Sequence, residues 1–134
     1  MNGGILGSWS NEQTAGGDGP NGIVLVKVTY RFCGTPTSGT YRYEEDGMDT
    51  PSRGCHRVAD LRGTFTLEGT KLLLTSKSGY QATEGCSDPT MNHRNDVTTE
   101  YTSEYEASVD GDTLTMIAIS AAGNSSPYEY TREP

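Results

Sequence analysis

Tyrosine is the residue type in this 134-residue chain that is best suited to hold a small molecule. The chain has eight tyrosines and only two phenylalanines. A tyrosine offers a large apolar ring and a hydroxyl that needs a hydrogen-bond partner when it is buried. A core made for packing alone would use more Leu, Val and Phe, so this bias favours a cavity for an aromatic or amphiphilic ligand. The alternative is a filled core whose tyrosines bond to one another and to water.

Residues with the spacing of a catalytic site are scarce. The chain has no Gly-x-Ser-x-Gly motif. No Ser–His–Asp arrangement can be read around its two histidines, His56 and His93. An enzyme is therefore the less favoured interpretation. It stays open because a tyrosine-lined cavity can act as a cyclase or isomerase, chiefly by shaping its substrate.

Metal ligands are also poorly arranged. Cys55, His56, Cys86 and His93 fit no compact zinc motif with paired ligands. The turn-rich segment 18–22 lacks the full ligand series of a calcium loop. We therefore expect no metal and no cofactor.

Charge and length narrow the class of partner. The formal net charge is -8, from 18 acidic and 10 basic residues. This balance argues against a nucleic-acid partner and against an anionic membrane surface. No apolar run reaches the length of a membrane span. The length fits one domain, residues 1–134.

The composition also favours a location outside the cytoplasm. Abundant Ser, Thr, Gly and Tyr, few lysines and an acidic balance favour an exported protein, periplasmic or extracellular. The first residues, Met1 to Gly4, have neither the basic nor the apolar region of a signal peptide. Export would therefore require a signal sequence that is absent from this chain.

Apolar and polar residues alternate with period two along most of the chain, as is typical of half-buried strands. No segment shows a sustained helical period. In this alternation the carboxylates of Asp60, Glu100, Glu104 and Glu106 fall on the outer face. The eight expected strands start at Gly7 and then span Ile23–Cys33, Ser38–Glu44, Arg57–Leu67, Lys71–Lys77, Val97–Val109, Thr113–Ile119 and Pro127–Arg132.

The connections between these strands alternate between short and long. In an antiparallel meander, successive connections lie at opposite ends of the sheet. The four long connections, 12–21, 45–56, 78–96 and 120–126, are therefore expected at one end, the mouth. The tight glycine turns gather at the other end, the floor. Eight strands with one apolar face each bury those faces by closing, so the fold class is all-β, an eight-stranded antiparallel up-and-down β-barrel.

Short motifs in the chain resemble one family with this architecture. The first strand begins Gly7-Ser8-Trp9 and the last strand ends at Arg132. Between them, Ser38-Gly39-Thr40-Tyr41, the stretch 63–69 (GTFTLEG) and the stretch 111–115 (GDTLT) follow in order. In order and spacing these motifs resemble the lipocalin-like (calycin) barrels, especially small bacterial ones, over nearly the whole chain. The chain is shorter than an animal lipocalin and has no C-terminal helix pattern.

The resemblance and the strand order together predict a structural pair at the floor. Trp9 starts the first strand and Arg132 ends the last strand, so both are expected at the floor. An arginine over an indole ring is a cation–π contact of about 0.5–2 kcal/mol. We expect this pair to close the barrel rather than to touch a ligand.

The strand directions also predict where a ligand lies. It is expected to enter at the mouth and to pack in the upper half of the barrel, where Met116 supplies an adaptable wall. The predicted ligand-binding residues are Val24, Val26, Tyr43, Ala59, Leu61, Leu74, Thr99, Tyr101, Met116 and Tyr128.

The three cysteines fall at two ends of the expected barrel. Cys55 and Cys86 lie in long connections at the mouth, whereas Cys33 ends a strand at the floor. A disulfide needs Cα atoms within about 7 Å. We therefore expect a Cys55–Cys86 disulfide and a free thiol at Cys33.

Three functions fit this sequence. The first is a carrier or scavenger that binds a small hydrophobic, aromatic or amphiphilic molecule inside the barrel. The second is a barrel enzyme acting on a sequestered apolar substrate. The third is a protein-binding barrel of the protease-inhibitor type, in which the segment 1–6 and the rim loops contact a protein partner. A large interior favours the first two, and a packed interior favours the third.

Overall fold

The computed structural model describes residues 4–15, 24–48, 56–86, 89–120, 123 and 127–133. Within these ranges one 3-10 turn, Pro89–Met91, is the helical content, and no helix could cross a membrane. The strands are β1 (Gly7–Ala15), β2 (Val24–Thr35), β3 (Ser38–Met48), β4 (His56–Glu68), β5 (Lys71–Glu84), β6 (His93–Asp96), β7 (Tyr101–Asp110), β8 (Thr113–Ile119) and β9 (Tyr128–Arg132).

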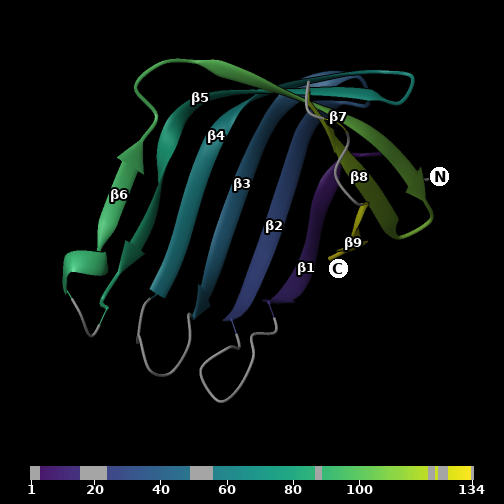
Figure 1. Cartoon of the computed structure of the whole chain (residues 1–134). Helices are drawn as coiled ribbons and strands as arrows, with labels where there is room; N and C mark the ends of the chain where they lie inside the picture. Colours follow the sequence, from purple (N-terminus) through teal and green to yellow (C-terminus); the bar gives the residue numbers. More distant parts are fainter. Residues whose placement is uncertain are drawn as a thin grey trace.

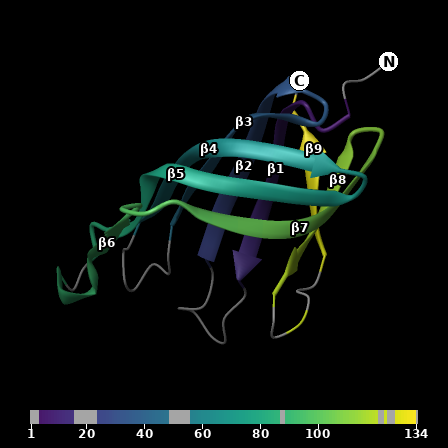
Figure 2. The same ribbon diagram turned by 90° about the horizontal axis from the view of Figure 1, so that it is seen from above.

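Eight of these strands form a closed antiparallel ring in the order β1-β2-β3-β4-β5-β7-β8-β9. Strand β9 pairs back onto β1 through Trp9 and Arg132, which closes the ring. Figure 2 shows β4, β5 and β7 crossing in front of β1, β2 and β3, with β8 and β9 beside them. The predicted fold class, an eight-stranded up-and-down barrel, is therefore confirmed.

The strand ends separate the mouth from the floor, as predicted. At the mouth, Ala15 pairs with Val24, and His56 pairs with both Met48 and Glu84. These ends lie at the bottom of Figure 1. At the floor, tight turns join β2 to β3, β4 to β5 and β7 to β8. Glycine supplies the positive φ that two of these turns need, 59° at Gly69 and 60° at Gly111.

The barrel interior is built from the alternation seen in the sequence. On β2 the residues Val26, Val28, Tyr30 and Phe32 are all buried. Each buried side chain of this kind stabilises the fold by about 1.5–3 kcal/mol. The most completely buried side chains are large and mostly lie near the floor: Trp9, Phe32, Phe65, Ile5, Leu72 and Leu114.

The predicted strand Val97–Val109 is wrong at its mouth end. Residues 97–100 lie outside any strand, while His93–Asp96 forms the separate strand β6 on the end of β5 (Figure 1). The cause is a β-bulge. Gly63 pairs with Ser76 but Arg62 pairs with Ser78, so Lys77 is an extra residue in β5. The bulge interrupts the ladder opposite residues 97–100.

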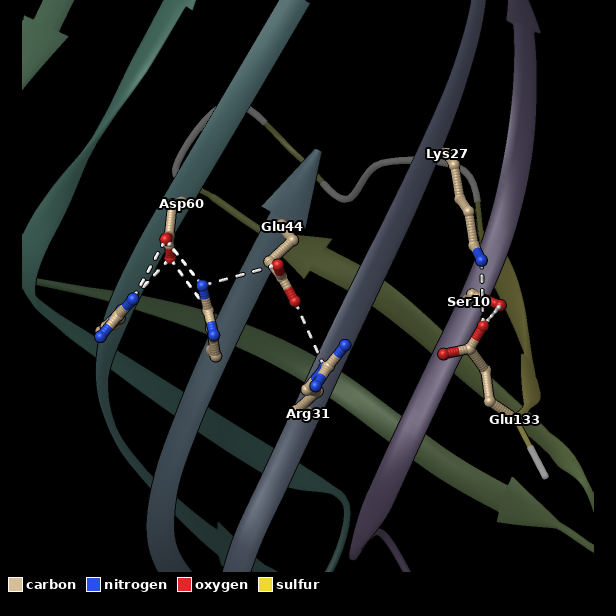
Figure 3. A network of polar contacts seen from close by, with 8 residues as sticks. Ser10, Lys27, Arg31, Glu44, Asp60 and Glu133 are labelled. Carbon is tan, nitrogen blue, oxygen red and sulfur yellow. Dashed lines mark hydrogen bonds and ion pairs between the residues drawn. The ribbon is translucent and has the colours of Figure 1, made fainter. Parts of the chain in front are cut away.

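Charged residues tie β2, β3 and β4 together on the outer face (Figure 3). Arg31, Arg42 and Arg62 stand in register on the three strands. Glu44 pairs with Arg31 at 3.2 Å and with Arg42 at 3.6 Å. Asp60 accepts two hydrogen bonds from Arg42, at 2.9 and 3.1 Å. The two carboxylates therefore offset the repulsion of three aligned cations.

Candidate functional site

A cavity of about 200 Å³ lies inside the barrel. Of its ten lining residues, two are leucines and the other eight carry a hydroxyl or an amide group. A cavity of 150 Å³ holds one benzene ring, so this space fits a single-ring molecule. The lining residues are Tyr30, Tyr41, Tyr43, Leu61, Leu74, Ser76, Gln81, Tyr101, Ser103 and Tyr105.

A second cavity of about 250 Å³ adjoins the first. The two share Tyr30, Tyr43 and Tyr105, which stand between them. Tyr101 and Tyr128 are about half exposed, at 46% and 49%, and line one cavity each. The second cavity is lined by Val28, Tyr30, Tyr43, Tyr105, Met116, Ala118, Tyr128 and Tyr130.

Aromatic contacts hold the tyrosines between the cavities in place. The Tyr30 ring lies 5.0 Å from the Tyr43 ring and 5.3 Å from the Tyr130 ring, centre to centre, the latter edge-on. Such pairs add about 0.5–1.5 kcal/mol each beyond burial. Burial raises the pKa of Tyr30 well above its usual range, and the nearby phenols of Tyr105 and Tyr130 raise it further. The phenol of Tyr30 therefore stays neutral at any physiological pH.

Two more phenols in the cavity have fixed partners. The Tyr41 hydroxyl hydrogen bonds to Ser76 Oγ. The Tyr43 hydroxyl donates to Glu45 Oε2 at 2.5 Å. Burial, and then the hydrogen bond to Glu45, raises the pKa of Tyr43 well above its usual range. Tyr43 therefore keeps its proton, which it donates to Glu45.

Glu45 brings a carboxylate to the inner face of the barrel. It pairs with Val28 on β2 and with Ala59 on β4, and both of these residues are buried. Its side chain is only 14% exposed and lies 3.4 Å from the Arg57 guanidinium. Glu45, Arg57 and Gln81 line a polar space of about 120 Å³ at the mouth. Gln81 also lines the inner cavity, so the two spaces meet there.

The floor is closed by the predicted pair. The Arg132 guanidinium carbon lies 4.1 Å from the centre of the Trp9 ring, and Trp9 is fully buried. Trp9 Nε1 donates to the Ile5 carbonyl at 2.7 Å. Arg132 donates to the carbonyls of Leu6 and Gly4 at 2.8 and 3.0 Å. Residues 4–6 are thus bound across the floor and do not extend away from the barrel as a free arm.

Six of the predicted ligand-binding residues line the two cavities. Tyr43, Leu61, Leu74 and Tyr101 line the first. Tyr43 also lines the second, together with Met116 and Tyr128. Strand direction and the period of two were sufficient to find them.

The other four predicted residues do not line these cavities. Val26 and Ala59 are buried in the wall. Thr99 is exposed on the segment after β6, because the strand is interrupted there. It lines a neighbouring space of about 250 Å³ together with Leu61 and Tyr101, which also line the first cavity. The side chain of Val24 lies outside the described residues.

The sequence pattern missed two polar residues of the mouth. Glu45 was missed because the third strand was expected to end at Glu44, whereas β3 continues to Met48. The series Tyr41, Tyr43, Glu45 was the available signal, because it continues the inward alternation. Gln81 was missed because the fifth strand was expected to end at Lys77, and β5 continues to Glu84 beyond its bulge.

The cysteines and histidines form no shared centre among the described residues. Cys33 is a free, exposed cysteine, as predicted. Cys86 is buried and disulfide-bonded, but Cys55 lies outside the described residues, so the predicted pairing stays a prediction. His56 contacts the Asp46 carboxylate. No group of three metal-ligating side chains comes together in the described part of the chain.

Scans of the chain against protein-family models, curated proteins and solved structures found no match. The class of protein therefore follows from the barrel itself. It is an eight-stranded up-and-down β-barrel with a tyrosine-lined interior and a polar mouth.

Proposed function

We propose that this protein binds a small aromatic molecule inside its barrel, as a carrier or scavenger of the lipocalin-like type. The observation that carries this proposal is the cavity of about 200 Å³ whose lining combines five tyrosine rings with serine and glutamine side chains. Rings offer stacking surface, and the hydroxyls fix the orientation of a polar substituent. The closed floor leaves the mouth as the route of entry.

The composition of the lining refines the class of ligand. Leu61 and Leu74 are the aliphatic members of a set that is otherwise able to hydrogen bond. Tyr41 and Tyr43 already have partners in the barrel. A long aliphatic chain would bury the remaining polar groups of the lining without offering them a hydrogen bond, which costs free energy. An aromatic ring with a polar substituent satisfies both kinds of wall. A net charge of -8 also disfavours a strongly anionic ligand.

The lipocalin-like assignment and an exported location belong to the same proposal. The closed up-and-down barrel supports the first, together with the Trp9–Arg132 contact at its floor. The acidic, lysine-poor composition supports the second. A scavenger of free small molecules suits a periplasmic or extracellular location.

The test is a titration of the whole chain with phenol and with toluene, in which the NMR chemical shifts of the backbone amides are measured. We expect saturable shifts at the strand residues around Ser103 and Tyr105. Ser103→Phe fills the cavity and should abolish them. Thr102→Phe is the matched control, because Thr102 is exposed on the same strand. Absence of saturable binding by the natural chain, or equal binding by both variants, would overturn the proposal.

A further inference from the structure

Glu45 controls the direction of a hydrogen bond inside the barrel. The Tyr43 hydroxyl donates its single proton to Glu45 Oε2 at 2.5 Å. An ionised carboxylate can only accept, so it holds that proton toward itself. Tyr43 lines both interior cavities. To a molecule in either cavity, its phenol oxygen can therefore offer lone pairs and no proton.

The carboxylate is well placed to enforce this arrangement. Its side chain is 14% exposed, so solvent competes little for it. Arg57 lies 3.4 Å from the other oxygen, Oε1, and balances its charge at the mouth. Tyr43, Glu45 and Arg57 together are thus close to neutral, and the Tyr43 oxygen remains an acceptor toward the cavity.

From this arrangement we infer that the interior site selects neutral aromatic molecules that donate a hydrogen bond, such as phenols, over aromatic molecules that only accept one. Glu45 is the positioning residue that sets this preference through Tyr43. The inference rests on the proposed function, because it concerns the ligand of the same cavity. A site built to pair a ligand hydroxyl discriminates strongly against analogues that lack it.

Three ligands of similar size test the inference: phenol, which donates, benzaldehyde, which only accepts, and toluene, which does neither. We expect the natural chain to bind phenol about tenfold more tightly than benzaldehyde or toluene, the size of effect of one hydrogen bond. Dissociation constants come from NMR or calorimetric titration of the full chain. Equal affinities, or tighter binding of benzaldehyde, would refute the inference and leave the proposed function standing. Absence of binding by all three would instead refute the proposed function.

Two variants assign the preference to this pair of residues. In Glu45→Gln the amide can donate to the phenol oxygen and release the Tyr43 proton toward the ligand, so the ratio of phenol to benzaldehyde affinity should fall to about one. Tyr43→Phe removes the acceptor, so the ratio of phenol to benzaldehyde affinity should also fall to about one, while the affinity for toluene is unchanged. A purely structural role would lower the three affinities together and leave the ratio unchanged.

A matched variant controls for net charge. Glu106→Gln removes one negative charge at an exposed position of β7 and should keep the natural ratio. The inference is wrong if Glu106→Gln changes the ratio as much as Glu45→Gln does. It is also wrong if Tyr43→Phe keeps the preference for phenol.

Discussion

Arg132 covers the face of the Trp9 ring at 4.1 Å and at the same time donates hydrogen bonds to the backbone carbonyls of Gly4 and Leu6. One side chain from the last strand thus joins the first strand and the segment before it. Asp112 lies 3.4 Å from the same guanidinium, on the exposed side. The two ends of the chain are held together where the barrel ring closes.

This arrangement predicts coupled losses of stability. Trp9→Ala should lower the free energy of unfolding by about 3–5 kcal/mol, as is typical for truncating a buried aromatic side chain. Arg132→Ala should cost less, because its side chain is partly exposed. The double variant should lose less than the sum of the two, since the residues are in contact. Chemical denaturation of the four proteins measures this, and additive losses would show that the contact contributes nothing.

The ion pairs on the outer face of β2, β3 and β4 predict a loss of stability in acid. The hydrogen bond from Arg42, and then the one from Arg62, lowers the pKa of Asp60. A carboxyl with a lowered native pKa stabilises the fold fully above its unfolded pKa of about 3.9. That contribution is lost as the pH falls through the lowered native value. Asp60→Asn should lower the free energy of unfolding by about 1 kcal/mol at pH 7. It should also make the melting temperature fall less steeply between about pH 5 and about pH 2.

Asp110→Asn is the control for the acid experiment. Asp110 is exposed beside a turn, so its replacement should leave the acid profile parallel to that of the natural chain. A flattened profile in this variant, or an unchanged one in Asp60→Asn, would show that the ion pairs of Asp60 do not cause the loss of stability in acid.

The cysteines predict a specific peptide map. A non-reduced digest analysed by mass spectrometry should contain a peptide that joins Cys55 to Cys86. Cys33 should react with a thiol reagent in the native protein, because it is free and exposed. A bridge that closes a loop of roughly 30 residues stabilises by about 3–4 kcal/mol in the chain-entropy model, so reduction should lower the melting temperature. A peptide that joins Cys33 to another cysteine would contradict the placement of these residues at opposite ends.

The close approach of β4 and β5 next to the bulge predicts a strict need for glycine. Gly79 has a φ of +121°, and a Cβ added there would lie 1.9 Å from the Asp60 carbonyl oxygen. Gly79→Ala should therefore cost at least about 2 kcal/mol. Gly69→Ala is the control, with a φ of +59° but no atom within 4 Å of its Cβ, and should cost about 1–2 kcal/mol. Thermal melts compare the two, and equal losses would exclude the steric explanation.

Sequence periodicity predicted those parts of the molecule in which strand pairing is regular. The run Thr113–Ile119 matches β8 at both ends, and the alternation from Val26 to Phe32 matches the burial of β2. Both segments pair without a break in register, so a period of two maps directly onto inside and outside. The same reasoning correctly brought Trp9 to Arg132, because it needed only the strand order.

The mouth was harder to predict for a physical reason. Strands extend as far as their neighbours pair with them, and pairing depends on partners that are distant in sequence. Glu45 is drawn into β3 by Val28 and Ala59 on the two flanking strands. The bulge at Lys77 depends on the geometry of β4 opposite Gly63, and its local signal is a pair of glycines within strands, Gly63 and Gly79. Without the bulge, the alternation through Leu72, Leu74 and Ser76 would have turned Tyr80 and Ala82 inward.

The extra residue Lys77 determines which side chains of β5 face the mouth of the barrel. With Lys77 in place, Gln81 lines the interior cavity, while Tyr80 lies beneath Arg94, 4.1 Å from its guanidinium carbon. If Lys77 instead took a regular place in the ladder and the pairing of the floor end were kept, every side chain beyond it would change face. Tyr80 would then turn inward and Gln81 outward, so an aromatic ring would replace an amide at the entrance. The bulge that follows Ser76 therefore determines which side chains a molecule meets on its way to the tyrosines.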